Sequence, residues 1–223
     1  MDLDRKNIPL PKVMPVDRKT WLHILSNSNF QNAAAEYSDI LSLPDISTVL
    51  VIGPGQGLDV AILRWRDYVI TTFDIDQTFS PDYVGSVHDL SQFSDKQFDL
   101  VIASHVLEHL PVMYLNKSLR ELARVARYAL VFLPLAGRHF QFRLKADVKV
   151  FDYSIFFSLY NFIEKPDGVT PRYCAGQHFW EIGYRGFRKK DLIVRLETSF
   201  KIIRHYRNIN WNPSYNFVLE SKG

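Results

Sequence analysis

The chain has 223 residues, 47% hydrophobic and 23% charged, a balance that predicts one globular domain over 1–223. No apolar run is long enough to cross a membrane, and residues 1–17 carry mixed charges and three prolines, which argues against a secretory signal. The single cysteine, Cys174, excludes an internal disulfide and any multi-cysteine metal site. We therefore expect a cytoplasmic protein without a bound metal or a membrane partner.

The net charge is +3, but the basic residues concentrate in the last part of the chain. Residues 135–223 hold 15 Lys and Arg against 8 Asp and Glu. This excess favours an anionic small-molecule partner, and it also suits an ordinary solvated surface. No Lys/Arg cluster is dense enough to indicate nucleic acid, so no nucleic-acid partner is expected.

The predicted elements begin with an irregular arm and a helix within residues 1–45. Apolar positions at helical spacing predict the helix over 29–43, and Pro44 ends it. Strands and helices then alternate, which predicts a parallel sheet covered by helices on both faces. The expected strands are 48–52, 68–73, 83–84, 98–103, 128–133, 200–206 and 216–220, and the expected helices are 58–65, about 115–126 and about 188–199.

Residues 135–187 interrupt this alternation. They contain 13 Phe, Tyr or Trp in 53 residues. We interpret the segment as an insertion after the fifth strand, whose aromatic side chains form a small core of their own or a lid over the ligand edge of the sheet.

A glycine-rich loop, Gly53-Pro54-Gly55-Gln56-Gly57, stands between the first strand and the next helix. Glycine permits a tight turn there and lets a ligand approach the backbone closely. Asp74 ends the second strand, where a carboxylate can accept hydrogen bonds from both hydroxyls of an adenosine ribose. The pattern predicts a nucleoside-containing cofactor; a structural turn and a helix-capping acid are the alternatives.

Three other motifs compete with this interpretation. A dinucleotide fingerprint, G-x-G-x-x-G, requires glycine at position 58, where the chain has Leu58. A P-loop is excluded because no Gly-Lys-Ser/Thr follows. The sequence from His105 to His109 fits the zinc motif H-x-x-E-H, with both histidines one turn apart if the segment is helical, but a helix is expected after the fourth strand in any case.

Six segments together resemble the class I S-adenosylmethionine-dependent methyltransferases, in particular the broad group with a methyltransferase type 11 domain. In the order of that family they are 49–57, 72–76, 85–90, 98–104, 106–110 and 120–125. The resemblance covers about 47–134 and, in outline, 188–221. It implies an α/β fold, a Rossmann-like seven-stranded methyltransferase sheet whose last strand is antiparallel, with the aromatic-rich insertion after the fifth strand.

The resemblance also implies the cofactor S-adenosylmethionine and its contacts. The glycine loop would wrap the methionine part, Asp74 would hold the ribose, and Ile75 would pack on the adenine. The expected cofactor-binding residues are Gly53, Pro54, Gly55, Gln56, Gly57, Asp74, Ile75, Val87, His88, Asp89, Ala103 and Ser104. Val51 and Ser86 depart from the family, which often has acidic residues there. A water-mediated or backbone contact to the cofactor's amino group would replace the acid at 51.

The implied reaction is methyl transfer to a small-molecule acceptor, at a hydroxyl or carboxylate oxygen. A hydroxyl needs a general base, and the candidates are His105 and His178. Trp180 and Tyr184 are candidate acceptor walls, and basic residues after the fifth strand are candidate partners for an acceptor anion. The alternatives are a cofactor-binding regulatory module without turnover and a nicotinamide oxidoreductase. The sequence leaves the acceptor and the oligomeric state open.

Overall fold

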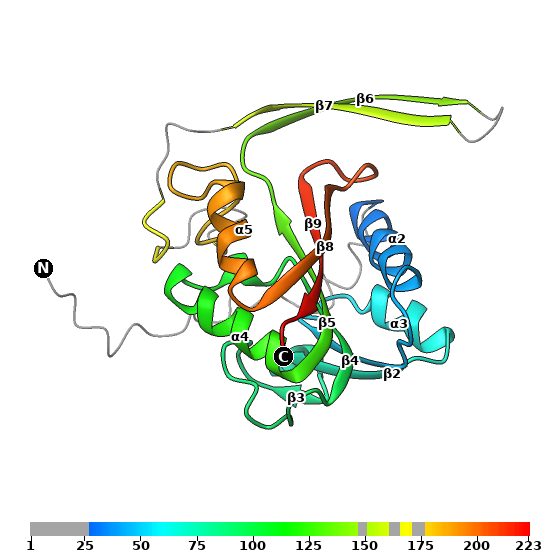
Figure 1. Cartoon of the computed structure of the whole chain (residues 1–223), viewed down its shortest axis with the longest axis vertical. Helices are drawn as coiled ribbons and strands as arrows, with labels where there is room; N and C mark the ends of the chain where they lie inside the picture. Colours follow the sequence, from blue (N-terminus) through cyan, green and yellow to red (C-terminus); the bar gives the residue numbers. More distant parts are fainter. Residues whose placement is uncertain (1–26, 147–150, 161–165, 171–176) are drawn as a thin grey trace, which may run out of the picture.

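The computed structural model describes residues 27–146, 151–160, 166–170 and 177–223. The predicted arm over 1–26 and Cys174 lie outside these ranges. A seven-stranded sheet forms the centre of the molecule, with helices on both faces (Figure 1). None of the described helices is both long and apolar enough to cross a membrane.

The sheet has the strand order β3-β2-β1-β4-β5-β9-β8. Its members are β1 (Thr48–Ile52), β2 (Val69–Asp74), β3 (Tyr83–Val84), β4 (Phe98–Ser104), β5 (Ala126–Pro134), β8 (Phe200–Arg207) and β9 (Ser214–Ser221). β1 to β5 pair in parallel, whereas β9 pairs antiparallel with both β5 and β8. This confirms the predicted seven-stranded α/β sheet with an antiparallel last strand.

The two faces of the sheet carry separate hydrophobic cores. Helices α2 (Asn27–Leu41) and α3 (Leu58–Trp65) cover one face, and α4 (Leu115–Val125) and α5 (Lys189–Glu197) cover the other (Figure 1). Within β1, Val51 packs toward the first face and Leu50 toward the second. A strand buried on both sides has to be apolar throughout, which explains the unbroken run over β1.

The boundary between α4 and β5 differs from the sequence prediction. Leu115, Leu119 and Leu122 form the buried stripe of α4, as expected. The stripe was extended to Ala126, but that residue begins β5 and pairs with Phe98. Alanine is buried equally well in either element, so its periodicity gives no boundary.

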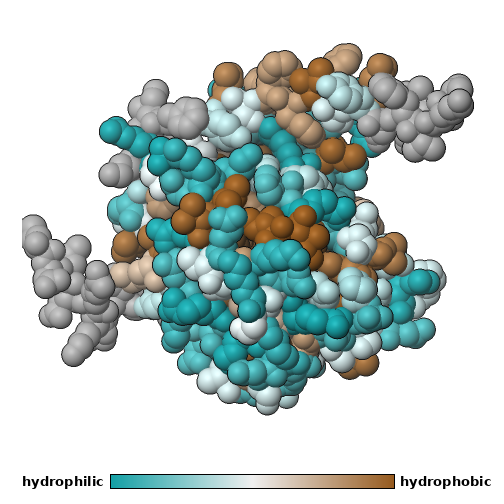
Figure 2. Space-filling view, in the orientation of Figure 1, coloured by the Kyte–Doolittle hydropathy of each residue, from teal (hydrophilic) through white to brown (hydrophobic). Residues whose placement is uncertain are grey.

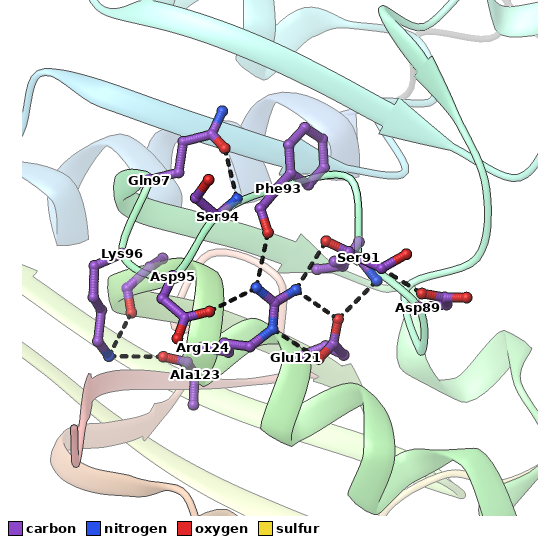
Figure 3. A network of polar contacts seen from close by, with 12 residues as sticks. Asp89, Ser91, Phe93, Ser94, Asp95, Lys96, Gln97, Glu121, Ala123 and Arg124 are labelled. Atoms are coloured by element: carbon purple, nitrogen blue, oxygen red, sulfur yellow. Dashed lines mark hydrogen bonds and ion pairs between the residues drawn. The ribbon is translucent and has the colours of Figure 1, made fainter.

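Arg124, at the end of α4, fixes the loop that precedes β4 (Figure 3). Its guanidinium donates to both carboxylate oxygens of Glu121, to the carbonyls of Leu90 and Phe93, and to Asp95. Because a planar guanidinium presents its N–H groups as a rigid fork, one side chain holds several turns of irregular backbone. That loop directly follows Val87, His88 and Asp89, which are among the expected cofactor-binding residues.

A long hairpin, β6 (Arg138–Ala146) and β7 (Phe151–Leu159), lies apart from the main sheet and extends across one end of the molecule (Figure 1). It follows β5 directly, so it starts at the carboxyl edge of the parallel strands. The hairpin falls within the predicted insertion, 135–187.

Candidate functional site

An open pocket lies where β1 ends, between the glycine loop and α2. Its lining comes from α2, the 52–59 segment, the end of β4 and the β8–β9 loop: Ser28, Asn29, Asn32, Ala33, Glu36, Ile52, Gly53, Pro54, Gly55, Gln56, Gly57, Leu58, Asp59, Ser104, His105, His109 and Trp211. The carboxyl edge of parallel strands is the ligand-binding edge of α/β sheets. The structure thus brings the whole predicted glycine loop and Ser104 to one pocket.

The glycine loop has a conformation that other residues adopt at a cost. Gly53, Gly55 and Gly57 have φ values of 65°, 51° and 72°. A Cβ on Gly53 would also stand 2.7 Å from Val106 Cγ2. The loop is closed by a hydrogen bond from Gly57 N to the Pro54 carbonyl, 2.7 Å, and leads directly into α3. These features suit a backbone that a ligand approaches closely.

The pocket wall formed by α2 is polar and buried. Asn32 Nδ2 donates to Ser104 Oγ at 2.6 Å and to Glu36 Oε1 at 2.9 Å. The second carboxylate oxygen of Glu36 and the Asn32 amide oxygen are buried without a hydrogen-bond partner. Burial first, and then the nearby Asp59, raise the pKa of Glu36 well above its usual range. Buried acceptors without donors fit a ligand that brings its own N–H groups.

Asp74 lies at the end of β2, as the ribose assignment requires. It is 8% exposed, and its Oδ1 accepts a hydrogen bond from the Asp76 backbone N–H at 2.8 Å. Burial raises the pKa of Asp74 from its usual value. Asp76, also buried, caps the following turn by accepting from Thr78 N. Asp74 does not line the pocket, its Oδ1 is held by the Asp76 backbone, and its contact with a ribose stays a prediction.

The other expected cofactor contacts lie beside the pocket and do not line it. Ile75 is 37% exposed, Val87 is buried in the core, and Ala103 is fully buried within β4. The His88 ring packs on Tyr114 and its Nδ1 contacts Ser86 Oγ at 2.7 Å. Asp89 is exposed, and accepts a hydrogen bond from Ser91 N. Their roles toward the cofactor stay predictions.

His105 stands at the pocket with an unusual backbone. Its φ of 53° is rare for a residue with a side chain, and such strain of about 1–3 kcal/mol concentrates at functional positions. Its Nδ1 lies 3.3 Å from the carboxylate of Glu108, and its Nε2 lies 3.2 Å from Ser214 Oγ. Trp211 packs on the ring. His105 and Glu108 therefore form a histidine–carboxylate arrangement at the pocket.

Glu108 is completely buried behind His105. Burial acts to raise its pKa, but the contact with His105, and the charges of His105, His109 and His178, hold the pKa below its ordinary value. Its Oε1 lies 3.3 Å from His105 Nδ1, and neither carboxylate oxygen makes a hydrogen bond to the described residues. A carboxylate in this position orients the imidazole and stabilises its protonated form.

The H-x-x-E-H segment does not form the α-helix on which the zinc interpretation depended. Only Leu107–His109 is helical, as a single 3₁₀ turn, because His105 takes a left-handed backbone. Three potential ligand atoms, from Glu108, His109 and His178, do lie within 4.8 Å of one another. However, Glu108 is already paired with His105, and His178 Nδ1 with Glu181 Oε1 at 2.7 Å.

His178 is brought beside the pocket by the segment after residue 176. It is 7% exposed and stacks edge-on against His109, which lines the pocket. The His178–Glu181 pair thus stands one ring behind the pocket wall. Neither His178 nor Glu181 lines the pocket itself. The role of His178 as a base stays a prediction.

Most aromatic and basic residues of the insertion that were candidates for acceptor contacts are buried or hydrogen-bonded to other parts of the chain. Trp180 is 2% exposed, and donates from Nε1 to the Leu110 carbonyl at 3.1 Å. Tyr184 is also buried. Arg143 donates to Asn210 Oδ1, and His139 Nε2 contacts the Leu135 carbonyl. Trp180 is therefore part of the core and not an exposed acceptor wall.

Sequence reasoning missed ten of the pocket residues, among them Asn32, Glu36, Asp59, His109 and Trp211. A signal existed in α2, where Asn29, Asn32 and Glu36 recur at helical spacing among small apolar residues. A polar stripe on a helix next to a core indicates a solvated face or a site, and only the packing of α2 over β1 decides between them.

A family model described as a methyltransferase domain matches residues 50–129. This range contains the glycine loop, Asp74 and the His105–Glu108 pair. A comparison with curated protein sequences gives no match.

Solved structures share the fold at low sequence identity. The PH0226 protein from Pyrococcus horikoshii OT3 is 15% identical, with a TM-score of 0.56 over 91% of this chain and 96% of that chain. An S-adenosylmethionine-dependent methyltransferase from Archaeoglobus fulgidus is 17% identical, with a TM-score of 0.55 over 88% and 95%.

A third structure is the 1,6-didemethyltoxoflavin-N1-methyltransferase of Burkholderia thailandensis, with its substrate and S-adenosylhomocysteine bound. It is 13% identical, with a TM-score of 0.51 over 97% of this chain and 94% of that chain. At these identities the likeness establishes the fold, and the family model and the motifs add the cofactor class. Residues 50–129 thus match a methyltransferase domain, and the chain has the fold of class I S-adenosylmethionine-dependent methyltransferases.

Proposed function

We propose that the protein transfers the methyl group of S-adenosylmethionine to an oxygen atom of a small molecule, with His105 as the general base. The observation that carries this proposal is the His105–Glu108 pair at the pocket. A hydroxyl is a weak nucleophile until its proton is removed, and a histidine oriented by a buried carboxylate is suited to that task.

The residues divide the work between cofactor and acceptor. Gly53 to Gly57 and Asp74 would hold the cofactor, which supplies a methyl group on a positively charged sulfur. Ser104 ends β4, His105 follows it, and both line the same pocket. Holding the acceptor oxygen in line with the methyl carbon supplies roughly 7–11 kcal/mol of the barrier reduction. The contact from His105 Nε2 to Ser214 is the one that an acceptor hydroxyl has to replace.

Small-molecule acceptors also fit the surroundings of the site. The Burkholderia enzyme is an N1-methyltransferase with 1,6-didemethyltoxoflavin bound. In our chain the hairpin follows β5 at the pocket edge of the sheet, and we infer that residues 135–187 close over the acceptor as a lid within a single domain. An acceptor that is already anionic, such as a carboxylate, would need no base, so His105 favours a hydroxyl.

The test is methyl transfer from S-adenosylmethionine labelled in its methyl group to a panel of phenols, hydroxy acids, carboxylic acids and amines. We expect turnover of a hydroxyl compound. His105→Gln should lower kcat for that compound about 10²–10⁴-fold and leave the Kd for S-adenosylhomocysteine unchanged. His205→Gln, a histidine bonded to Tyr215 outside the pocket, is the control. Turnover of amines alone, or full activity of His105→Gln, would refute the proposal.

A further inference from the structure

The pocket contains two acidic side chains and no cationic side chain among the described residues that line it. Glu36 is 3% exposed, and its Oε2 has no hydrogen-bond partner. Asp59, at the start of α3, lines the same pocket, and burial raises its pKa to about 6. Among the described residues that line the pocket there is no lysine or arginine. A buried carboxylate is stable only with a partner, so the pocket is built to receive a positive group.

The positive group has to reach Oε2 from the pocket. On the other side of Glu36, Oε1 is already held by Asn32, whose amide also donates to Ser104. The Asn32 amide oxygen is itself buried without a donor. Two hydrogen-bonded side chains therefore each have a buried acceptor without a donor, Glu36 Oε2 and Asn32 Oδ1. This fits a group with several N–H donors, such as an ammonium.

We propose that Glu36, with Asn32 beside it, binds the α-ammonium group of the methionyl part of S-adenosylmethionine. Residue 51, two before the first glycine, is a valine that packs toward α2. The carboxylate comes instead from the helix above it, which replaces the water-mediated or backbone contact expected from the sequence. This inference rests on the proposed cofactor pose, in which the glycine loop wraps the methionyl part.

The cofactor carries a second cation, the sulfonium, which the test has to separate from the ammonium. S-adenosylhomocysteine keeps the ammonium and lacks the sulfonium. 5′-Methylthioadenosine keeps the adenosyl part and lacks the amino-acid group. Titration calorimetry of the purified full chain with both compounds therefore isolates the contact to the ammonium. Glu36→Gln removes the charge and keeps the shape of the side chain.

We expect Glu36→Gln to raise the Kd for S-adenosylhomocysteine about 10–100-fold, and to change the Kd for methylthioadenosine less than twofold. Asp39→Asn is the matched control: this acid is also buried in α2, but it pairs with Arg204 and Tyr206 away from the pocket. It should leave both Kd values unchanged.

Two results would overturn the proposal. An equal loss of affinity for both compounds would mean that Glu36 only supports the structure, and unchanged affinity for both would mean that the ammonium lies elsewhere. If the unaltered protein binds neither compound, the cofactor assignment itself fails, which is recognisable before any variant is made.

An independent observation concerns the hairpin. Seven large apolar side chains point to one face of β6 and β7 and are 40–67% exposed: Phe140, Phe142, Leu144, Tyr153, Ile155, Phe157 and Leu159. Figure 2 shows hydrophobic side chains along this end of the molecule. The opposite face of the hairpin is anchored to the β8–β9 region, where Gln141 donates to the Ile209 carbonyl and Arg207 donates to Ser158. The apolar face is thus turned outward.

The size and composition of this face indicate its partner. At roughly 200 Å² for each large side chain, the exposed area is about 800 Å². That is more than monomers usually expose as one patch, and it equals one side of a standard interface. Cross-strand partners such as Phe140 and Phe157, or Phe142 and Ile155, make the face apolar along both strands. Two copies of such a face can pack as stacked sheets about 10 Å apart.

We propose that the hairpin's apolar face pairs with that of a second copy of this chain. Sedimentation velocity should show a dimer at micromolar concentration. Phe142→Glu and Phe157→Glu should each raise the dimer dissociation constant at least about a hundredfold. Val194→Glu on α5 is the control, because Val194 is 64% exposed and Phe142 is 63%. The proposal is wrong if the unaltered protein is a monomer, whether or not it binds phosphatidylcholine vesicles. It is also wrong if the two hairpin variants are still dimers.

Discussion

Arg124→Lys tests whether one guanidinium holds the loop that leads into β4. The substitution keeps the positive charge and most of the side chain's length. It removes the fork that spans Glu121, Asp95 and two backbone carbonyls (Figure 3). A lysine ammonium has its donors on one atom and cannot reach acceptors on three sides at once.

The expected loss in the free energy of unfolding depends on which hydrogen-bond acceptors lose their donor. The carbonyls of Leu90 and Phe93 belong to residues that are 0% and 2% exposed, and the Arg124 side chain is 28% exposed. Each carbonyl left without a donor costs about 1–3 kcal/mol. The ion pair with Asp95 adds little, because Asp95 is 77% exposed. With two carbonyls affected, we therefore expect the free energy of unfolding to fall by about 2–6 kcal/mol.

The measurement is urea unfolding at pH 7, followed by circular dichroism. Arg188→Lys is the control, since Arg188 makes a similar bidentate contact to Asp191 on the surface, and should change stability by less than about 0.5 kcal/mol. If Arg124→Lys lies within 0.5 kcal/mol of the unaltered protein, the loop is held by its buried Leu90 and Phe93 side chains, and the reasoning from the guanidinium is wrong.

Three further predictions concern the site and the sheet. Asp74→Asn should raise the Kd for S-adenosylhomocysteine about tenfold or more in calorimetry while the melting temperature is kept; unchanged affinity would contradict the ribose assignment. Gly53→Ala should destabilise the fold by about 1–3 kcal/mol in urea unfolding, and more than Gly57→Ala, whose Cβ would meet no atom within 4 Å. Burial acts to raise the pKa of Asp99, but hydrogen bonds from Thr48 and Ser47 outweigh it and lower the pKa to about 2. Its stabilisation is present above the unfolded pKa near 3.9 and lost as pH falls toward 2, so Asp99→Asn should cost about 1–2 kcal/mol at pH 7 and flatten the pH dependence of unfolding below pH 4.

The parts of the fold that were predicted correctly depend on local pattern. The run over 48–52 is apolar because β1 is buried on both faces, and Gly53 and Gly57 bound the turn that follows it. The helix over Leu58–Trp65 was located to the residue. Hydrophobic period and glycine position act over a few residues, so the sequence displays them directly.

The parts that were missed depend on tertiary contact. Glu36 lies on an ordinary amphipathic helix, and its burial arises only where α2 crosses the end of β1. The helical interpretation of 105–109 was wrong because His105 adopts a left-handed backbone. The hairpin had a legible signal in the alternation of Phe140, Phe142 and Leu144, but the aromatic richness of the insertion obscured it.

The buried acidic side chains at the site lower the stability of the ligand-free protein at neutral pH. Burial raises the pKa of Glu36, Asp59 and Asp74. A carboxyl whose pKa is raised by folding lowers stability at neutral pH, because the folded state prefers its protonated form and the unfolded chain does not. Glu36→Gln should therefore raise the melting temperature of the free protein by a few degrees, while weakening S-adenosylhomocysteine binding.

These opposite signs separate a binding group from a structural one. Neutralising a carboxylate that supports the fold lowers the stability of the protein and leaves ligand affinity unchanged, as expected for Asp39, which pairs with Arg204 and Tyr206 away from the pocket. Neutralising a carboxylate that binds the cation of a ligand raises the stability of the ligand-free protein and lowers its affinity for that ligand. Thermal unfolding of both variants, with and without S-adenosylhomocysteine, measures the change in stability and the change in affinity in one experiment. A lower melting temperature for ligand-free Glu36→Gln would show that the charge is already compensated within the chain.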